Sequence, residues 1–191
     1  KLDAIATRSP AECPVLTPCG GEAFPAKYHD ALRAFMAKGG TIILPSGLPF
    51  YYDVQIQPDG SKKRVQVNDR DVASFHIAWT SWWTHKGTPE NMTFQKNAPA
   101  FDGTLKVDWK GRRAARFLDT RNLKEGDKMT PIILAGDGDF SAPVIALYEL
   151  NSDLKGNVLV CTNMQINECV SLETQAEDLP RTYLLAFAYG I

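Results

Sequence analysis

The chain has 191 residues, of which 44% are hydrophobic and 23% are charged. This balance is typical of a soluble globular domain and excludes a disordered, collagenous or coiled-coil chain. The 21 basic and 22 acidic residues give a net charge of −1, so no positive excess favours nucleic acid or an anionic membrane as a partner. The apolar runs also fall far short of the ~20 residues of a membrane span.

A strand, a helix and a second strand are predicted within the first 44 residues. The apolar run 14–17 ends in a Pro-Cys-Gly-Gly turn and predicts a strand. Apolar residues at helical spacing follow Pro25: Tyr28, Leu32, Phe35 and Met36. Gly39-Gly40 ends the helix, and the uniformly apolar run 41–44 is typical of a strand buried on both faces of a parallel sheet. Together these elements form a βαβ unit.

The middle of the chain has a different pattern. Two alternating segments flank the turn Pro58-Asp59-Gly60 and predict an exposed hairpin. Residues 68–116 lack clear periodicity but contain all four tryptophans, so we interpret them as an irregular Trp-rich excursion. The hairpin and the excursion form an insertion at about 50–116 in an α/β frame.

Regular structure resumes in the last third of the chain. The runs 130–135, 143–150 and 156–161 predict three strands, and 179–188 carries a helix-like apolar stripe. No internal repeat or low-complexity tract divides the sequence, so we interpret 1–191 as a single domain.

The first βαβ unit resembles a known superfamily. Its residues are Val15-Leu16-Thr17-Pro18-Cys19-Gly20-Gly21-Glu22-Ala23-Phe24-Pro25 and, further on, Phe35-Met36-Ala37-Lys38-Gly39-Gly40 before 41–44. This pattern is similar to the class I glutamine amidotransferase-like superfamily. The resemblance is to its non-amidotransferase branches, namely trehalose-utilisation-type proteins and the middle domains of β-galactosidase-like glycoside hydrolases. It implies a flavodoxin-like three-layer α/β sandwich with a mainly parallel sheet.

The same resemblance argues against glutamine hydrolysis. The amidotransferases place a Gly-x-Cys-x-Gly elbow after the second strand, where this chain has Leu44-Pro45-Ser46-Gly47-Leu48. Their downstream His-x-Glu pair has no counterpart after Val158. Ser46 is the candidate nucleophile if chemistry survives, and it would need a histidine base oriented by an acid. We consider His76 for that role, with His85 as the alternative, and we expect His29 on a polar helix face.

The segment Ala78-Trp79-Thr80-Ser81-Trp82-Trp83-Thr84-His85 is the second functional cue. Indole rings beside hydroxyl and imidazole groups suit stacking on sugars, and they equally suit a protein–protein contact. We therefore name Trp79, Trp82, Trp83 and His85 as candidate ligand-binding residues and expect at least one of the three tryptophans to be exposed.

Other motifs argue against metals and cofactors. The four cysteines pair locally, Cys13 with Cys19 and Cys161 with Cys169, at spacings unlike those of zinc sites, so free thiols and local disulfides both stay open. The Asp137 and Asp139 turn lacks the length of a calcium loop, and no dinucleotide or phosphate-binding motif is present. The basic cluster around Trp109 is interpreted as a solvated face.

These observations favour an accessory, non-catalytic domain of a carbohydrate-processing, glycoside hydrolase-type protein that shapes a cleft or an oligomer interface. Its expected partners are carbohydrate or a neighbouring catalytic domain, and homo-oligomerisation is a further expectation. A hydrolase that uses Ser46 is the alternative, and a protein-binding domain that uses the Trp-rich loop is a third hypothesis. A periplasmic or secreted location is favoured over a cytoplasmic one.

Overall fold

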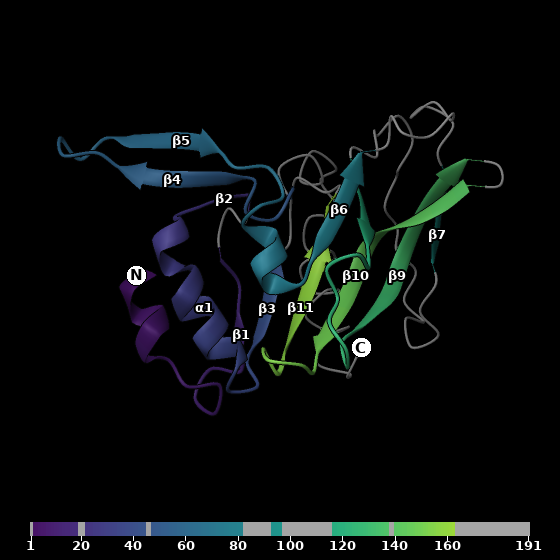
Figure 1. Cartoon of the computed structure of the whole chain (residues 1–191), viewed down its shortest axis with the longest axis horizontal. Helices are drawn as coiled ribbons and strands as arrows, with labels where there is room; N and C mark the ends of the chain where they lie inside the picture. The colour runs from purple at the N-terminus through teal and green to yellow at the C-terminus, as the bar shows by residue number, and fades with distance from the viewer. Residues whose placement is uncertain are drawn as a thin grey trace, which may run out of the picture.

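The computed structural model describes residues 2–18, 22–44, 47–81, 93–96, 116–137 and 140–162. Strands dominate these residues, and most of the helical residues lie at one end of the molecule (Figure 1). The helical elements are η1 (Leu2–Thr7), η2 (Ala26–Tyr28), α1 (His29–Met36) and η3 (Val72–Phe75). The strands are β1 (Val15–Leu16), β2 (Ala23–Phe24), β3 (Thr41–Leu44), β4 (Tyr52–Ile56), β5 (Lys62–Gln66), β6 (Ala78–Ser81), β7 (Thr93–Lys96), β8 (Arg116–Asp119), β9 (Lys128–Asp137), β10 (Phe140–Leu150) and β11 (Gly156–Cys161).

The largest sheet is mixed and has the strand order β1-β3-β11-β10-β9-β7. Strand β3 lies between β1 and β11 and pairs in parallel with both. The strands β10, β9 and β7 continue the sheet in antiparallel fashion. The predicted parallel pairing of 15–17 with 41–44 is therefore confirmed, but it describes only one end of the sheet.

The predicted flavodoxin-like three-layer sandwich is wrong. Among the described residues α1 is the one α-helix, and the sheets are mixed rather than mainly parallel. The three late strands were correctly expected, but their connections are far too short for crossover helices. A parallel connection needs a dozen or more residues, so short turns force β9, β10 and β11 into an antiparallel meander, which needs no covering helices.

The packed core begins at the parallel end of the sheet and extends along β10 to β6 and β8. Alternate residues of β3 and β11 join α1 in a single hydrophobic cluster, which includes Leu32, Phe35, Met36, Ile42, Leu44, Val158 and Val160. The opposite-facing Ile43 and Leu159 are also buried, as the uniformly apolar run predicted. At Gly156 an added Cβ would overlap the Gly40 carbonyl oxygen, so the chain packs backbone against backbone there.

Two smaller sheets complete the described fold. The predicted hairpin is confirmed as β4 and β5, which pair antiparallel and join β2 in a three-stranded sheet. Strands β6 and β8 form a two-stranded sheet near β10. The buried Tyr148 hydroxyl of β10 donates to the Asp119 carbonyl at 3.0 Å and lies 3.4 Å from the Ala78 carbonyl. The helix-like stripe 179–188 lies outside the described residues.

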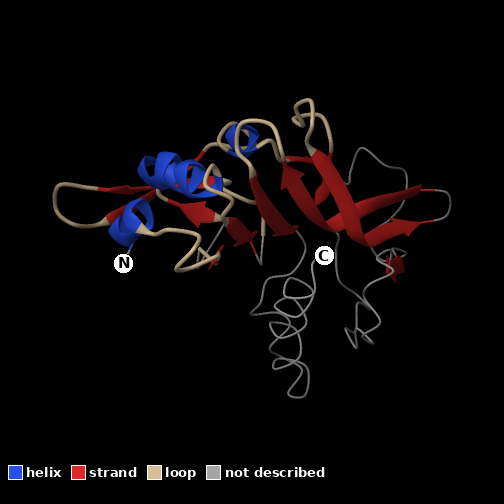
Figure 2. Cartoon of the chain, turned by 90° about the horizontal axis from the view of Figure 1, so that it is seen from below, coloured by secondary structure: helices blue, strands red, loops and turns tan. Residues whose placement is uncertain are grey.

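Figure 2 shows the same chain from below, with most of the helical residues near one end, a further helical turn near the middle, and long strands of the large sheet at the other end. No helix of the described part is long and apolar enough to cross a membrane.

Candidate functional site

His76 is the centre of the most connected polar cluster among the described residues. It follows η3 in a left-handed conformation with φ 57°, and its backbone N–H donates to the Ala73 carbonyl at 3.0 Å. Positive φ is uncommon outside glycine, although histidine is among the residues that tolerate it. This conformation ends the helical turn, and the His76 side chain is only 3% exposed.

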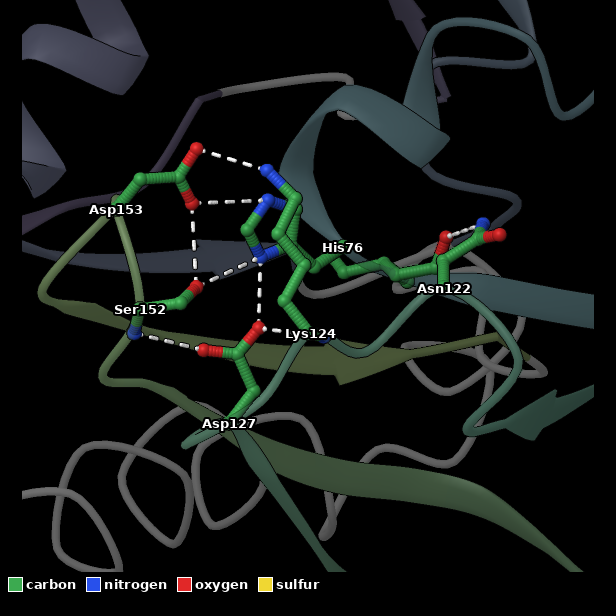
Figure 3. Close-up of polar contacts among 7 residues, drawn as sticks. His76, Asn122, Lys124, Asp127, Ser152 and Asp153 are labelled. Carbon is green, nitrogen blue, oxygen red and sulfur yellow. Dashed lines mark hydrogen bonds and ion pairs between the residues drawn. The ribbon is translucent and has the colours of Figure 1, made fainter.

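The imidazole of His76 lies between two carboxylates (Figure 3). Its Nδ1 is 2.7 Å from Oδ2 of Asp127, and its Nε2 is 3.2 Å from Oδ1 of Asp153. Both ring nitrogens therefore face a carboxylate oxygen, and each nitrogen can donate a hydrogen bond when it carries a proton.

Asp127 is the buried anchor of this cluster, with a side chain 0% exposed. Its carboxylate accepts the backbone N–H groups of Lys124 and Ser152, each at 3.0 Å. Burial acts to raise the pKa of Asp127, but hydrogen bonds from Lys124, Ser152 and His76 outweigh it and hold the pKa below its usual range. One carboxylate thus fastens His76 to two turns that are distant in sequence.

Asp153 forms the exposed side of the cluster and is 61% exposed. Lys124 Nζ donates to its Oδ2 at 2.8 Å, and this hydrogen bond is the main reason that the pKa of Asp153 falls to about 2. Because water screens exposed ion pairs, this contact adds little to stability. Of the two carboxylate contacts of His76, the buried one with Asp127 is therefore stronger than the exposed one with Asp153.

The segment between β8 and β9, which contains Asp127, also binds Ile77, the residue after His76. The Asn122 side-chain amide donates to the Ile77 carbonyl at 2.8 Å (Figure 3). His76 and Ile77 are therefore both held by groups in the segment between β8 and β9.

Serine, histidine and aspartate meet here without the geometry of a catalytic triad. In a triad the serine hydroxyl donates to one imidazole nitrogen, which no other group contacts, and the acid accepts from the other nitrogen. Here Ser152 Oγ lies 3.5 Å from Nδ1, the nitrogen that Asp127 already contacts, and it donates instead to Asp153 Oδ1 at 3.1 Å. The cluster is arranged as a structural clamp between η3 and the two turns.

His29 is buried, whereas the sequence predicted that it would lie on a polar helix face. Its ring lies between Phe24, Phe50 and Phe75, with centroid distances of 5.9, 4.7 and 5.5 Å. Burial is the main cause that lowers the pKa of His29, and Asp71, 3.9 Å from Nδ1, acts in the opposite direction. Its Nε2 has no hydrogen-bond partner among the described residues.

The remaining sequence candidates divide into two groups. Trp79 lies in β6, is 7% exposed and packs against Tyr51 at a ring distance of 5.8 Å. Ser46, Trp82, Trp83 and His85 lie outside the described residues, so their roles stay predictions. The expectation of an exposed tryptophan in this segment now depends on Trp82 and Trp83.

Sequence reasoning selected His76 but missed its partners. Asp127, Ser152 and Asp153 lie in segments that flank the predicted strands and to which the sequence patterns assigned no function. The one available signal was the density of aspartate in short connections, and aspartate is also an ordinary turn residue.

No group of three metal-ligating side chains suited to a cation occurs in the described ranges. Cys13, partly buried, has a free thiol that donates to the Val15 carbonyl at 3.3 Å. Comparison of the sequence with protein-family models and with curated proteins gives no match.

Proposed function

We propose that this chain is an accessory domain of a carbohydrate-processing protein, without catalysis of its own, that shapes a cleft or an oligomer interface. The observation that supports the non-catalytic part is the closed His76 cluster. Both imidazole nitrogens face carboxylates, and Ser152 and Asp127 approach the same nitrogen. A general base needs one nitrogen available to a nucleophile, so this geometry favours a clamp over a reaction centre.

The carbohydrate part of the proposal rests on the resemblance of residues 15–44 to non-amidotransferase branches of the superfamily. The parallel pairing of β1 with β3, and of β11 with β3, is compatible with that local resemblance. Ser46 stands where the amidotransferases have their elbow cysteine, and this difference supports a domain without glutamine hydrolysis. The superfamily's three-layer fold is not part of the proposal.

A substrate panel separates this function from the hydrolase alternative. The full chain is incubated with chromogenic esters and glycosides, and turnover is compared with that of the Ser46→Ala variant. We expect no turnover above the buffer blank from either protein. Turnover that falls ~10³-fold or more in Ser46→Ala, the scale expected for a true nucleophile, would establish the hydrolase and overturn the proposal.

Binding is tested separately by calorimetry of the full chain with neutral and acidic oligosaccharides. Heat of binding to either class supports the carbohydrate assignment. Absence of binding to every oligosaccharide, combined with capture of a protein partner that Trp82→Ala and Trp83→Ala abolish, would favour the protein-binding hypothesis instead.

A further inference from the structure

One face of the β4–β5 hairpin combines apolar and basic side chains. The register places Tyr52 opposite Gln66, Val54 opposite Arg64 and Ile56 opposite Lys62. Residues directly opposite one another in an antiparallel pair lie on the same face of the sheet. Each apolar residue of β4 therefore has a polar or basic neighbour on β5, and we call this set the hairpin face.

The opposite face of the same hairpin has a different composition. There Asp53 pairs with Val65 and Gln55 with Lys63. Asp53 is already engaged, because its carboxylate accepts the Ala26 backbone N–H at 2.8 Å and the Gln55 amide at 3.1 Å. Only one cation, Lys63, lies on this side.

The hairpin face is accessible. Both views show β4 and β5 reaching out beyond α1 at the edge of the molecule (Figures 1 and 2). Ile56 is 57% exposed, and it is the one large hydrophobic residue found exposed among the described residues. Lys62, Arg64 and Gln66 are exposed as well.

The two cations of the hairpin face have no partner carboxylate within ion-pair distance among the described residues. Arg64 acts to lower the pKa of Glu22, but burial outweighs this effect and raises that pKa overall. Lys62 and Arg64 are thus available to a carboxylate supplied from outside.

Hydrogen-bonding groups gather at the base of the hairpin face. The Gln66 side-chain amide donates to the Tyr51 hydroxyl at 2.6 Å and to Asn68 Oδ1 at 2.8 Å. These bonds hold the three side chains in place. The side-chain oxygen of Gln66, the side-chain NH2 of Asn68 and the hydroxyl hydrogen of Tyr51 can each form a further hydrogen bond. The Tyr51 and Tyr52 rings stand at 87° with centroids 4.8 Å apart, so an aromatic pair adjoins these polar groups.

We propose that the hairpin face binds an acidic oligosaccharide whose sugar units bear carboxylates. The aromatic and aliphatic side chains would pack on the C–H faces of the sugar rings, the amides and the tyrosine hydroxyl would bond sugar hydroxyls, and Arg64 and Lys62 would bind the carboxylates. From Tyr52 to Ile56 the strand spans about 13 Å, room for a short run of sugar units. This inference rests on the proposed carbohydrate function and names its ligand class.

Two features favour a sugar over an acidic protein strand. Lysines on an edge strand such as β5 oppose the addition of another strand. The fixed amide and hydroxyl groups at the base match hydroxyl-rich ligands better than they match a peptide backbone. Because the whole chain has a net charge of −1, attraction of an anion must come from this local pair of cations.

The test is calorimetry of the full chain at low salt with tetragalacturonic acid, an α-1,4-linked acidic tetramer. Maltotetraose, with the same linkage but no carboxylates, is the neutral control. We expect the acidic tetramer to bind more tightly than the neutral one. Replacement of both cations, Lys62→Ala with Arg64→Ala, is expected to weaken binding about tenfold or more, the loss typical of residues that dominate a contact.

Lys63→Ala is the matched control, because Lys63 belongs to the same strand but points to the opposite face. We expect it to change affinity less than about twofold. Ile56→Ser tests the apolar part at an exposed position where misfolding is not expected, and it should weaken binding several-fold. Circular dichroism confirms that each variant keeps its secondary structure.

Several results would overturn the inference. They are absence of binding to the acidic tetramer, an equal loss in Lys63→Ala, and tighter binding of a glutamate decapeptide than of the tetramer, which would indicate an acidic protein segment. Neutral oligosaccharides that bind without sensitivity to any hairpin variant would remove this site while leaving the proposed function intact. Catalytic turnover in the substrate panel would instead remove the proposed function and leave the hairpin binding result standing.

Discussion

Replacement of Asp127 by alanine tests whether the His76 cluster is a structural clamp. The substitution removes the acceptor of three donors, namely the Lys124 and Ser152 backbone N–H groups and His76 Nδ1. A buried donor left without a partner costs about 1–3 kcal/mol, more when it is charged. Because turns admit some water, we expect a loss of about 3–5 kcal/mol in the free energy of unfolding, a large part of the 5–15 kcal/mol typical of a domain.

Asp153→Ala is the matched control. It removes the other carboxylate on the same imidazole, but this one is 61% exposed and paired to Lys124 at the surface. Water already solvates that pair, so we expect a change of about 1 kcal/mol or less. The difference between the two alanine variants isolates the buried contact.

The assay is equilibrium unfolding in urea, followed by circular dichroism at pH 7. A shift of the midpoint with an unchanged slope reports stability rather than a change in the unfolded chain. The reasoning is refuted if Asp127→Ala lies within about 1 kcal/mol of the wild-type chain or if it equals Asp153→Ala.

The pH dependence gives a second check on Asp127. Its pKa is held below the usual range in the folded state, so its carboxylate stabilises the fold fully above the unfolded pKa of about 3.9. That contribution is lost as the pH falls through the lower folded value. The stability difference between wild type and Asp127→Asn should therefore narrow below about pH 4.

Three further predictions concern the fold. Gly156→Ala should cost about 2–4 kcal/mol in unfolding free energy, because its Cβ would overlap the Gly40 backbone. Gly126→Ala is the control: its Cβ would meet open space, and its φ of 90° alone should cost only about 1 kcal/mol. Equal losses in the two variants would contradict the close packing at Gly156. Ile43→Asp places an unpaired charge at a position 3% exposed and should cost several kcal/mol, as urea midpoints would show, and a near-neutral effect would argue against burial of β3 on both faces. Since burial lowers the pKa of His29, the folded state resists protonation of this residue. Stability should therefore fall as the pH drops from the unfolded-state pKa of about 6.5 towards the lower folded-state pKa. His29→Leu should flatten this slope between about pH 7.5 and 5, and an unaltered slope would show that His29 is not its cause.

The amino-acid sequence by itself determined the local elements. The apolar run of β3, the periodic stripe of α1 and the Pro58-Asp59-Gly60 turn each specify their conformation within a few residues, so all three could be predicted. The parallel pairing of β1 with β3 followed too, because a helix of this length between two apolar strands has few ways to pack. The late strands were also recognisable from their composition.

The antiparallel half of the large sheet contradicts the predicted parallel fold. The strands were located, but the resemblance to a helix-flanked fold outweighed the short connections between β9, β10 and β11, which already excluded parallel crossovers. The burial of His29 was missed for a different reason. The His29 ring is enclosed by Phe24, Phe50 and Phe75, which come from three separate segments, and the sequence around His29 contains no sign of this packing.

Only the tertiary structure decided the partners of His76. Asp127 is 51 residues away in sequence and Ser152 is 76 away, so no local pattern links them. Propensity and periodicity act over one or two turns of chain, whereas a buried ion pair forms only where separate segments are brought together by packing of the core. The same holds for the hairpin face, whose residue types were readable but whose alignment depends on the register that pairs Tyr52 with Gln66 and not with its neighbour.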